Sequence, residues 1–150
     1  MITEDKFKVL ITTSGIGSRL GELTDYTNKS LVRIGSKPAL SLIIDNYPKD
    51  TEFVVTLGHY GDYVKQFLEM VYPERVFDFV LVDKYHGQGT SLGYSILQAK
   101  EHLQCPFIFN ACDTLFMTDE VIKKSLSSVK NFCVGDKRQD SSQYATLLVN

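Results

Sequence analysis

The chain has 150 residues, a formal net charge of -2 and 43% hydrophobic residues. That length suffices for one domain with a closed core, and the ordinary apolar content excludes intrinsic disorder. The slight acidic excess argues against a nucleic-acid binder, and no apolar run approaches the roughly 18–20 residues that cross a bilayer. The N-terminus carries acids where a signal peptide carries bases. We therefore expect a cytoplasmic protein with no nucleic-acid or membrane partner, and we leave homo-oligomer formation open.

Short apolar runs rich in β-branched residues alternate with amphipathic segments. In chain order, strands are predicted at residues 7–13, 53–57, 76–82, 106–110, 131–134 and 144–149. Helices are predicted at 38–46, with Pro38 in the first position, then from 62 to about 71, from the loop at 86–90 to 103, and at 118–129. A long polar loop covers 14–30, and 31–34 forms a short extended piece before a turn. This alternation predicts an α/β fold with a mainly parallel sheet and helices on both faces.

Four loops follow the predicted strands, at residues 14–30, 58–61, 83–89 and 111–117. In open parallel sheets, ligands bind beyond the carboxyl ends of the strands, where the strand order reverses. A compact domain rarely keeps a loop as long as residues 14–30 without a function. We therefore expect the chemistry of this protein in these four loops.

The first loop has the residues that bind phosphate groups. Gly15 and Gly17 let backbone N–H groups approach an oxyanion, and Arg19 and Lys29 supply positive charge. Residues 16–37 contain four bases and two acids, so this segment is positive in an acidic chain. An ordinary surface loop with solvated charges is the alternative. Leu20 stands where the dinucleotide fingerprint and the P-loop both need glycine.

The loop resembles the signature L-A-A-G-x-G-x-R-L…P-K-P-L of the sugar-nucleotide pyrophosphorylases, a nucleotidyltransferase family. Thr12, Thr13, Ser14 and Gly15 stand at L-A-A-G, Gly17 and Arg19 match, and Lys29 falls on the lysine. The later segments VVTLGHYGDYVKQFL, GQGTSLGYSIL and FIFNACDTLF also resemble family segments in order and spacing. The resemblance implies a Rossmann-like, GT-A-type three-layer sandwich.

The family resemblance also implies a reaction, in which the phosphate of an acceptor attacks the α-phosphorus of an NTP and pyrophosphate leaves. Arg19 would hold the β- and γ-phosphates, Lys29 would contact the α-phosphate, and Asp113 would bind Mg²⁺. The nucleotide-binding residues would be Thr12, Thr13, Ser14, Gly15, Gly17, Ser18, Gln88, Gly89 and Thr90. As alternatives, Asp113 caps a turn and Gln88 is a solvated loop residue.

The chain departs from the family pattern at several places. Ser14 adds a hydroxyl beside the base, and Asn28 replaces the proline of P-K, which we expect to loosen the backbone before Lys29. Cys112 replaces a glycine and is read as a tolerated small side chain. The family's second metal-binding aspartate has no counterpart after Tyr144. Residues 1–150 are therefore expected to be the nucleotide-binding part of such an enzyme without its acceptor-binding portion. This part alone need not be active.

Among the family, the short N-K-S-L segment is most similar to cytidylyltransferases that act in capsule or surface-polysaccharide synthesis. CTP is therefore the expected nucleotide, and the expected acceptor is a sugar phosphate, phosphocholine or a phosphorylated amino acid. A nucleotide-binding module without turnover is the first alternative. A GT-A-type glycosyltransferase is the second, although Cys112-Asp113-Thr114 lacks the Asp-x-Asp metal motif of that class.

Overall fold

The computed structural model describes residues 7–115, 119, 120, 131 and 133. The chain divides into two units, Met1–Thr118 and Asp119–Asn150, and every element described below belongs to the first. The helix predicted at 118–129 and the strands predicted at 131–134 and 144–149 lie almost wholly outside the described residues. They stay predictions.

A four-stranded parallel sheet forms the centre of the first unit, with the order β5-β4-β1-β6. The strands are β1 (Lys8–Thr12), β4 (Glu52–Leu57), β5 (Val76–Leu81) and β6 (Phe107–Ala111). In β1, Leu10 is paired with Val54 on one side and with Phe109 on the other. The chain therefore builds outward from β1 to β5 and then returns to the opposite side of β1.

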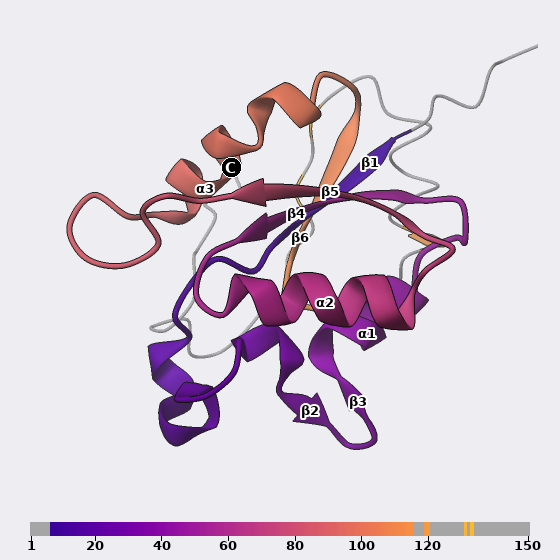
Figure 1. Cartoon of the computed structure of the whole chain (residues 1–150). Coiled ribbons are helices and arrows are strands. Elements are labelled where there is room, and N and C mark those ends of the chain that lie inside the picture. The colour runs from indigo at the N-terminus through magenta and orange to yellow at the C-terminus, as the bar shows by residue number, and fades with distance from the viewer. Residues whose placement is uncertain (1–6, 116–118, 121–130, 132, 134–150) are drawn as a thin grey trace, which may run out of the picture. The chain divides into compact units, whose positions relative to one another are not determined.

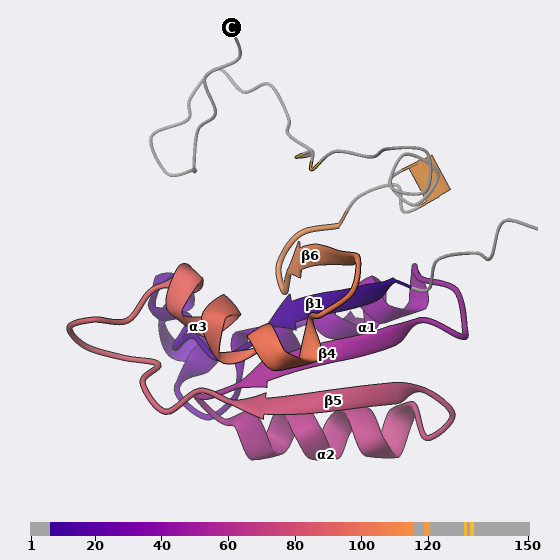
Figure 2. The ribbon, with the colours of Figure 1, turned by 90° about the horizontal axis from the view of Figure 1, so that it is seen from above.

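Helices cover both faces of this sheet (Figure 1). The helices α1 (Ala39–Asp45) and α2 (Gly61–Val71) lie on one face, and α3 (Leu92–Gln98) lies on the other, as the view from above also shows (Figure 2). The described part of the chain thus confirms the predicted three-layer α/β fold. Because both faces of β1 are covered, Val9, Leu10 and Ile11 are all fully buried, which explains why its sequence is a continuous apolar run.

Two packed layers hold the elements together. On the α1 and α2 side, the buried side chains include those of Leu40, Ile43, Ile44, Val64 and Leu68. On the α3 side, one cluster contains Leu10, Val54, Val80, Ala99 and Leu103, with Ile96 packed against it. Burying each of the larger aliphatic side chains stabilises the fold by about 1.5–3 kcal/mol. The sheet is therefore a fixed platform for the loops at its carboxyl edge.

The helix boundaries differ from the predicted ones. Pro38 is not the first residue of a helix: it is the extended N-cap of α1, and it lies in the small hairpin of β2 (Arg33–Ile34) and β3 (Lys37–Pro38). The helix α3 ends at Gln98 and is followed by the 3-10 helix η3 (Lys100–His102). The loop at 14–30 also contains local structure, namely the 3-10 helices η1 (Ser18–Thr24) and η2 (Lys29–Leu31).

No helix among the described residues is both long enough and apolar enough to cross a bilayer.

Candidate functional site

The reversal of strand order lies between β1 and β6. The chain leaves β1 for β4 and β5 on one side, and then crosses back to form β6 on the other. In a parallel sheet, the loops after two such strands diverge and leave a crevice between them. The loop after β1 and the turn after β6 therefore flank the expected ligand position, as the sequence predicts.

The first two residues of the loop after β1, Thr13 and Ser14, form hydrogen bonds to β4, to the loop after β4 and to α3. The Thr13 hydroxyl donates to the carbonyl oxygen of Thr56 at 2.6 Å, and the Thr13 N–H donates to the same oxygen at 3.2 Å. The carbonyl of Ser14 accepts from the N–H of His59 at 3.0 Å. The Ser14 hydroxyl shares a buried hydrogen bond of 2.9 Å with the hydroxyl of Ser95 on α3. The loop is thus bound to β4 and to α3.

Gly17 brings this loop close to Lys29. Its φ of 69° is in the left-handed region, and a Cβ atom at Gly17 would lie 2.9 Å from the Cβ of Lys29. Any other residue at this position would be strained and crowded. Ser18 and Arg19 follow on η1 with exposed side chains. The motif glycine therefore serves close packing of the loop against the lysine.

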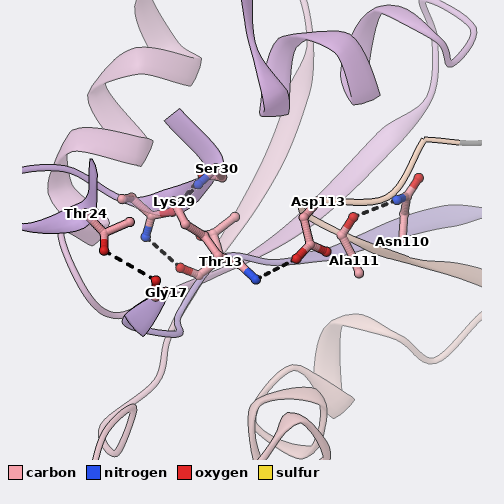
Figure 3. A network of polar contacts seen from close by, with 9 residues as sticks. Thr13, Gly17, Thr24, Lys29, Ser30, Asn110, Ala111 and Asp113 are labelled. Carbon is pink, nitrogen blue, oxygen red and sulfur yellow. Dashed lines mark hydrogen bonds and ion pairs between the residues drawn. The ribbon is translucent and has the colours of Figure 1, made fainter. Parts of the chain in front are cut away.

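Lys29 and Asp113 meet across the switch point (Figure 3). The ammonium of Lys29 lies 2.9 Å from Oδ2 of Asp113, and their side chains are 28% and 62% exposed. Burial acts to lower the pKa of Lys29, whereas Cys112 and the hydrogen bond to Asp113 raise it, and the net pKa is raised. Lys29 is therefore a permanent cation at neutral pH, and the structure brings together two of the predicted functional residues.

Asn28 does not loosen the backbone before Lys29, so that expectation is wrong. Asn28 is fully buried and is the N-cap of η2, where its side-chain oxygen accepts from the N–H of Ser30 at 2.9 Å. Asparagine is among the preferred N-cap residues, because its side chain satisfies an N–H that has no partner within the helix. The segment that carries Lys29 is consequently a capped turn.

Cys112 is buried directly before Asp113. Burial raises the pKa of its thiol to about 11, and the charge of Lys29 only partly opposes this effect. A thiol with this pKa is almost fully protonated at neutral pH and is a weak nucleophile. The structure therefore agrees with reading Cys112 as a small packed side chain.

A cavity of about 300 Å³ opens beside these residues. Its lining consists of Thr12, Ser14, Gly15, Ile16, Lys29, Lys84, Tyr85, Thr90, Ser91, Leu92 and Ser95. The predicted residues Thr12, Ser14, Gly15, Lys29 and Thr90 are among them. The predicted residues Thr13, Gly17, Ser18, Arg19, Gln88, Gly89 and Asp113 lie outside this lining. The roles of both groups stay predictions.

Six lining residues were not predicted as site residues, namely Ile16, Lys84, Tyr85, Ser91, Leu92 and Ser95. Ile16 lies inside the first loop, while Lys84 and Tyr85 follow β5 in a loop that the topology already marks as facing the ligand. Ser91 caps α3, since its hydroxyl oxygen accepts from the N–H of Tyr94 at 3.0 Å. Leu92 matches the apolar stripe of α3 in sequence, yet it is 52% exposed and lines the cavity. Its spacing in the sequence indicates a core position and does not reveal that it lines a cavity.

The loop between β5 and α3 has a defined conformation. The Tyr94 hydroxyl donates to Asp83 at 2.5 Å, and the Thr90 hydroxyl donates to the carbonyl of Gly87 at 2.8 Å. Gly87 and Gly89 have φ values of 84° and 87°, which side chains other than hydrogen rarely allow. Gln88 between them is exposed and outside the lining. The glycines therefore shape the turn that presents Tyr85 and Thr90.

The lining is positively charged and rich in hydroxyl groups. Lys29 and Lys84 contribute two cations, and no carboxylate is among the described residues that line the cavity. Ammonium and hydroxyl groups are donors to phosphate oxygens and to ribose, and Tyr85 and Leu92 add apolar surface. A cavity with this lining fits an anionic ligand that also has an apolar face.

The fit to Mg²⁺ depends on Asp113. Its exposed carboxylate stands at the carboxyl end of β6, and Mg²⁺ in proteins takes one or two carboxylates together with phosphate and water oxygens. Within the part of the chain that the structure describes, no group of three or more His, Cys, Asp or Glu residues could hold a metal ion. A single carboxylate does not make a preformed metal site, but it fits a Mg²⁺ ion whose other ligands are phosphate and water oxygens.

Comparisons with known proteins find relatives of this chain in sequence and in fold. The bifunctional IPC transferase and DIPP synthase of Archaeoglobus fulgidus is 28% identical over 120 residues, which are 79% of this chain and 22% of that protein. The solved structure of CTP:phosphocholine cytidylyltransferase from Streptococcus pneumoniae (LicC) is 25% identical with a TM-score of 0.57, over 76% of this chain and 50% of that one.

A third protein is similar in fold. UDP-glucose pyrophosphorylase, solved in complex with UDP-glucose, has a TM-score of 0.64 at 18% identity, over 81% of this chain and 52% of that one. No family model matches the sequence. The chain spans about a fifth of the curated relative and about half of these solved structures. Fold and sequence together confirm the resemblance to the nucleotidyltransferases.

Proposed function

We propose that this chain is the nucleotide-binding part of a nucleotidyltransferase that transfers a nucleoside monophosphate from an NTP to a phosphorylated small molecule. One observation carries the proposal: at the switch point of the sheet, a cavity of about 300 Å³ is lined by two lysines and several hydroxyl groups. A triphosphate brings several negative charges to the site, and paired cations offset their repulsion from a second phosphate. The similarity to the cytidylyltransferase, at 25% identity, favours CTP as the nucleotide.

In the proposed reaction, a phosphate oxygen of the acceptor attacks the α-phosphorus in line. The new bond joins that oxygen to the α-phosphorus, and the bond to the β-phosphate oxygen breaks to release pyrophosphate. Lys29 would stabilise the charge that develops at the α-phosphate. Arg19, exposed on η1, would hold the departing phosphates together with the N–H groups of the first loop. Asp113 would hold Mg²⁺, which offsets phosphate charge when it is bound.

We further propose that the acceptor is a sugar phosphate, phosphocholine or a phosphorylated amino acid, and that the product serves capsule or surface-polysaccharide synthesis in the cytoplasm. The printed activity of the cytidylyltransferase, with phosphocholine as substrate, supports this range. The lining of the cavity does not distinguish among these acceptors, so a panel of compounds is the appropriate test.

The test measures pyrophosphate release by the full-length protein that contains this chain, from each of CTP, UTP, GTP and ATP with each acceptor class. Release that needs one nucleotide and one acceptor supports the proposal. Saturable nucleotide binding in calorimetry without release for any pair would instead identify a nucleotide-binding module. Transfer of sugar from a nucleotide sugar without pyrophosphate release would identify a glycosyltransferase.

Changing Arg19 to Ala tests the catalytic assignment. Loss of a donor that stabilises transition-state charge typically lowers kcat by about 10²–10³-fold, and we expect a decrease of this size in pyrophosphate release. Because Arg19 is exposed, the circular dichroism spectrum and unfolding midpoint should not change. Arg33→Ala is the matched control, since Arg33 is also exposed but lies in β2 and donates to the carbonyl of Ser36. Equal kinetics for the two variants would remove Arg19 from the mechanism.

A further inference from the structure

The side-chain amide of Asn28 makes four hydrogen bonds in the fully buried interior. Its nitrogen donates to the carbonyl oxygens of Thr13 at 2.7 Å and His59 at 2.6 Å. Its oxygen accepts from the N–H of Ser30 at 2.9 Å and from the hydroxyl of Ser30 at 2.8 Å. A primary amide has two N–H donors and one oxygen with two lone pairs. Every donor and acceptor of this buried amide is therefore matched.

The four bonds join three segments that are far apart in sequence. Thr13 follows β1, His59 follows β4, and Ser30 lies in η2, the turn that begins at Lys29. A fully satisfied buried polar network fixes one arrangement, because breaking any of its bonds leaves a buried group unpaired. The amide therefore sets where η2 begins relative to the carboxyl ends of two strands. A proline, which the resembled family has at this position, could form none of these bonds.

Lys29, the next residue, is also held along its side chain. Its Cβ and Cδ pack against Gly17, where an added Cβ would lie 2.9 and 3.4 Å from these atoms. Its ammonium ends 2.9 Å from Asp113 (Figure 3). The backbone of Lys29 follows the Asn28 amide, its aliphatic stem contacts the first loop, and its ammonium pairs with Asp113, while Lys29 is one of the residues that line the cavity. Contacts therefore hold Lys29 along its whole length, from the backbone next to the Asn28 amide to the ammonium beside Asp113.

We propose that Asn28 is a positioning residue, whose amide holds Lys29 at the nucleotide phosphates by tying η2 to the ends of β1 and β4. The proposal deepens the nucleotidyltransferase function and rests on it for the role of Lys29. A purely structural amide would stabilise the fold without a specific link to Lys29. If Asn28 is purely structural, the effects of changing Asn28 and Lys29 should add. If Asn28 positions Lys29, changing Asn28 should have no further effect once Lys29 is removed.

The test is a double-mutant cycle with Asn28→Asp and Lys29→Ala. Aspartate keeps the size and the capping oxygen but cannot donate to Thr13 and His59, and its charge faces their carbonyl oxygens. We expect N28D alone to lower kcat for pyrophosphate release and the affinity for the NTP by about tenfold or more, since small misplacements of catalytic groups have effects of this order. In the K29A background, the same change should have no further effect on either quantity, because coupled residues are not additive.

Two further variants separate positioning from general destabilisation. Asn28→Ser keeps a capping oxygen for Ser30 without the two donors, and it should show the same coupling to Lys29 without an added charge. Ile44→Val removes one methyl group from the fully buried face of α1 and should lower the unfolding midpoint while leaving the NTP affinity unchanged. Loss of affinity in I44V, or an equal effect of N28D with and without Lys29, would overturn the proposal.

Hydrogen exchange decides the same question without nucleotide. The N–H of Leu31 donates to the carbonyl of Asn28, and the N–H of Val32 donates to that of Lys29. Both amides should exchange faster in N28D than in I44V if the Asn28 side chain holds η2 in place. Unchanged exchange overturns the positioning role, whatever the activity. If the unaltered protein neither binds an NTP nor releases pyrophosphate, the proposed function fails by itself, and this exchange result still decides whether Asn28 positions Lys29.

Discussion

Gly58 lies where the loop after β4 passes the loop after β1. A Cβ atom at this position would lie 2.5 Å from the carbonyl oxygen of Ser14 and 2.9 Å from its Cα. Both neighbours are backbone atoms of a residue that is itself tied to Ser95, so a side-chain rotation cannot relieve the contact. Glycine is required here by close approach of two backbones, one of which belongs to Ser14, a residue that lines the candidate site.

Gly58→Ala should therefore lower the free energy of unfolding by about 1–3 kcal/mol, which is the usual cost of overpacking. Urea unfolding measures the change. Gly93→Ala is the matched control, since the nearest atom to an added Cβ is Ser91 Oγ at 3.8 Å and Gly93 lies within α3. Alanine inside a helix is favoured over glycine by about 0.5–1 kcal/mol, so G93A should be the more stable protein. Equal stability of the two variants would contradict the predicted close approach.

At the scale of elements, charged groups connect the amino ends of the strands. Lys8 on β1 donates to Asp78 on β5 at 2.8 Å, and its ammonium is 3.7 Å from Glu52 on β4. His102 on η3 lies 3.4 Å from the same Asp78 oxygen. The hydrogen bond from Lys8 lowers the pKa of Asp78 from its ordinary 3.8, more than burial raises it. These contacts join β1, β4, β5 and η3 at the edge opposite to the site.

Asp78→Asn should remove a pH-dependent part of the stability. A carboxyl whose pKa is depressed in the folded state stabilises the fold above its unfolded pKa, and this contribution is lost as the pH falls through the lower folded value. The stability difference between the unaltered protein and D78N should therefore be full at pH 7 and shrink below about pH 3.8. Both side chains are partly exposed, so screening keeps the difference within about 1 kcal/mol.

Urea unfolding between pH 7 and pH 3 measures this difference. Glu101→Gln serves as the control, because its carboxylate pairs with the exposed Lys100 at 3.5 Å and should contribute no measurable stability. A difference between the unaltered protein and D78N that stays constant down to pH 3 would mean that the charge of Asp78 does not stabilise the fold.

The strands could be predicted from the sequence more closely than the helix ends. Buried strands of a parallel sheet are covered on both faces, so β1 and β4 appear as short, mainly apolar runs rich in β-branched residues, which is typical of such strands. Helix ends depend on local hydrogen bonds instead. Pro38 has the φ of a first helical residue, yet its pairing with Arg33 holds it extended. Gly17 and Gly21 likewise shape η1 through positive φ values that no apolar pattern reveals.

At the scale of the whole molecule, the sequence predicts a site at the switch point of the sheet, and a cavity lies there whose lining includes only some of the predicted residues. Gly15 and Lys29 line this cavity, whereas Gly17 does not. Leu92 is a case that periodicity misassigns, since the same spacing fits a core position and a cavity wall. Asn28 is another, because its effect depends on carbonyls of Thr13 and His59 that only the folded chain brings together.

The whole described unit should respond to the nucleotide as one cooperative fold. A ligand that binds only the folded state at about 100 times its Kd stabilises it by about 2.7 kcal/mol. For a chain of 150 residues, about 2–4 °C of unfolding midpoint corresponds to each kcal/mol, so CTP with Mg²⁺ should raise the midpoint by about 5–11 °C. The shift should decrease with added salt, because the attraction between the lysines and the phosphates is screened.

Lys84→Ala tests whether this shift originates in the cavity. Lys84 lines the cavity on the loop after β5, and its removal should reduce the nucleotide-induced shift while leaving the midpoint without nucleotide unchanged, because the side chain is exposed. Lys100→Ala is the charge-matched control on η3, outside the lining, and should keep the full shift. Equal shifts in the two variants would place the nucleotide elsewhere. The absence of a shift with every NTP would exclude both the proposed enzyme and a nucleotide-binding module, because each needs this cavity to bind a nucleotide.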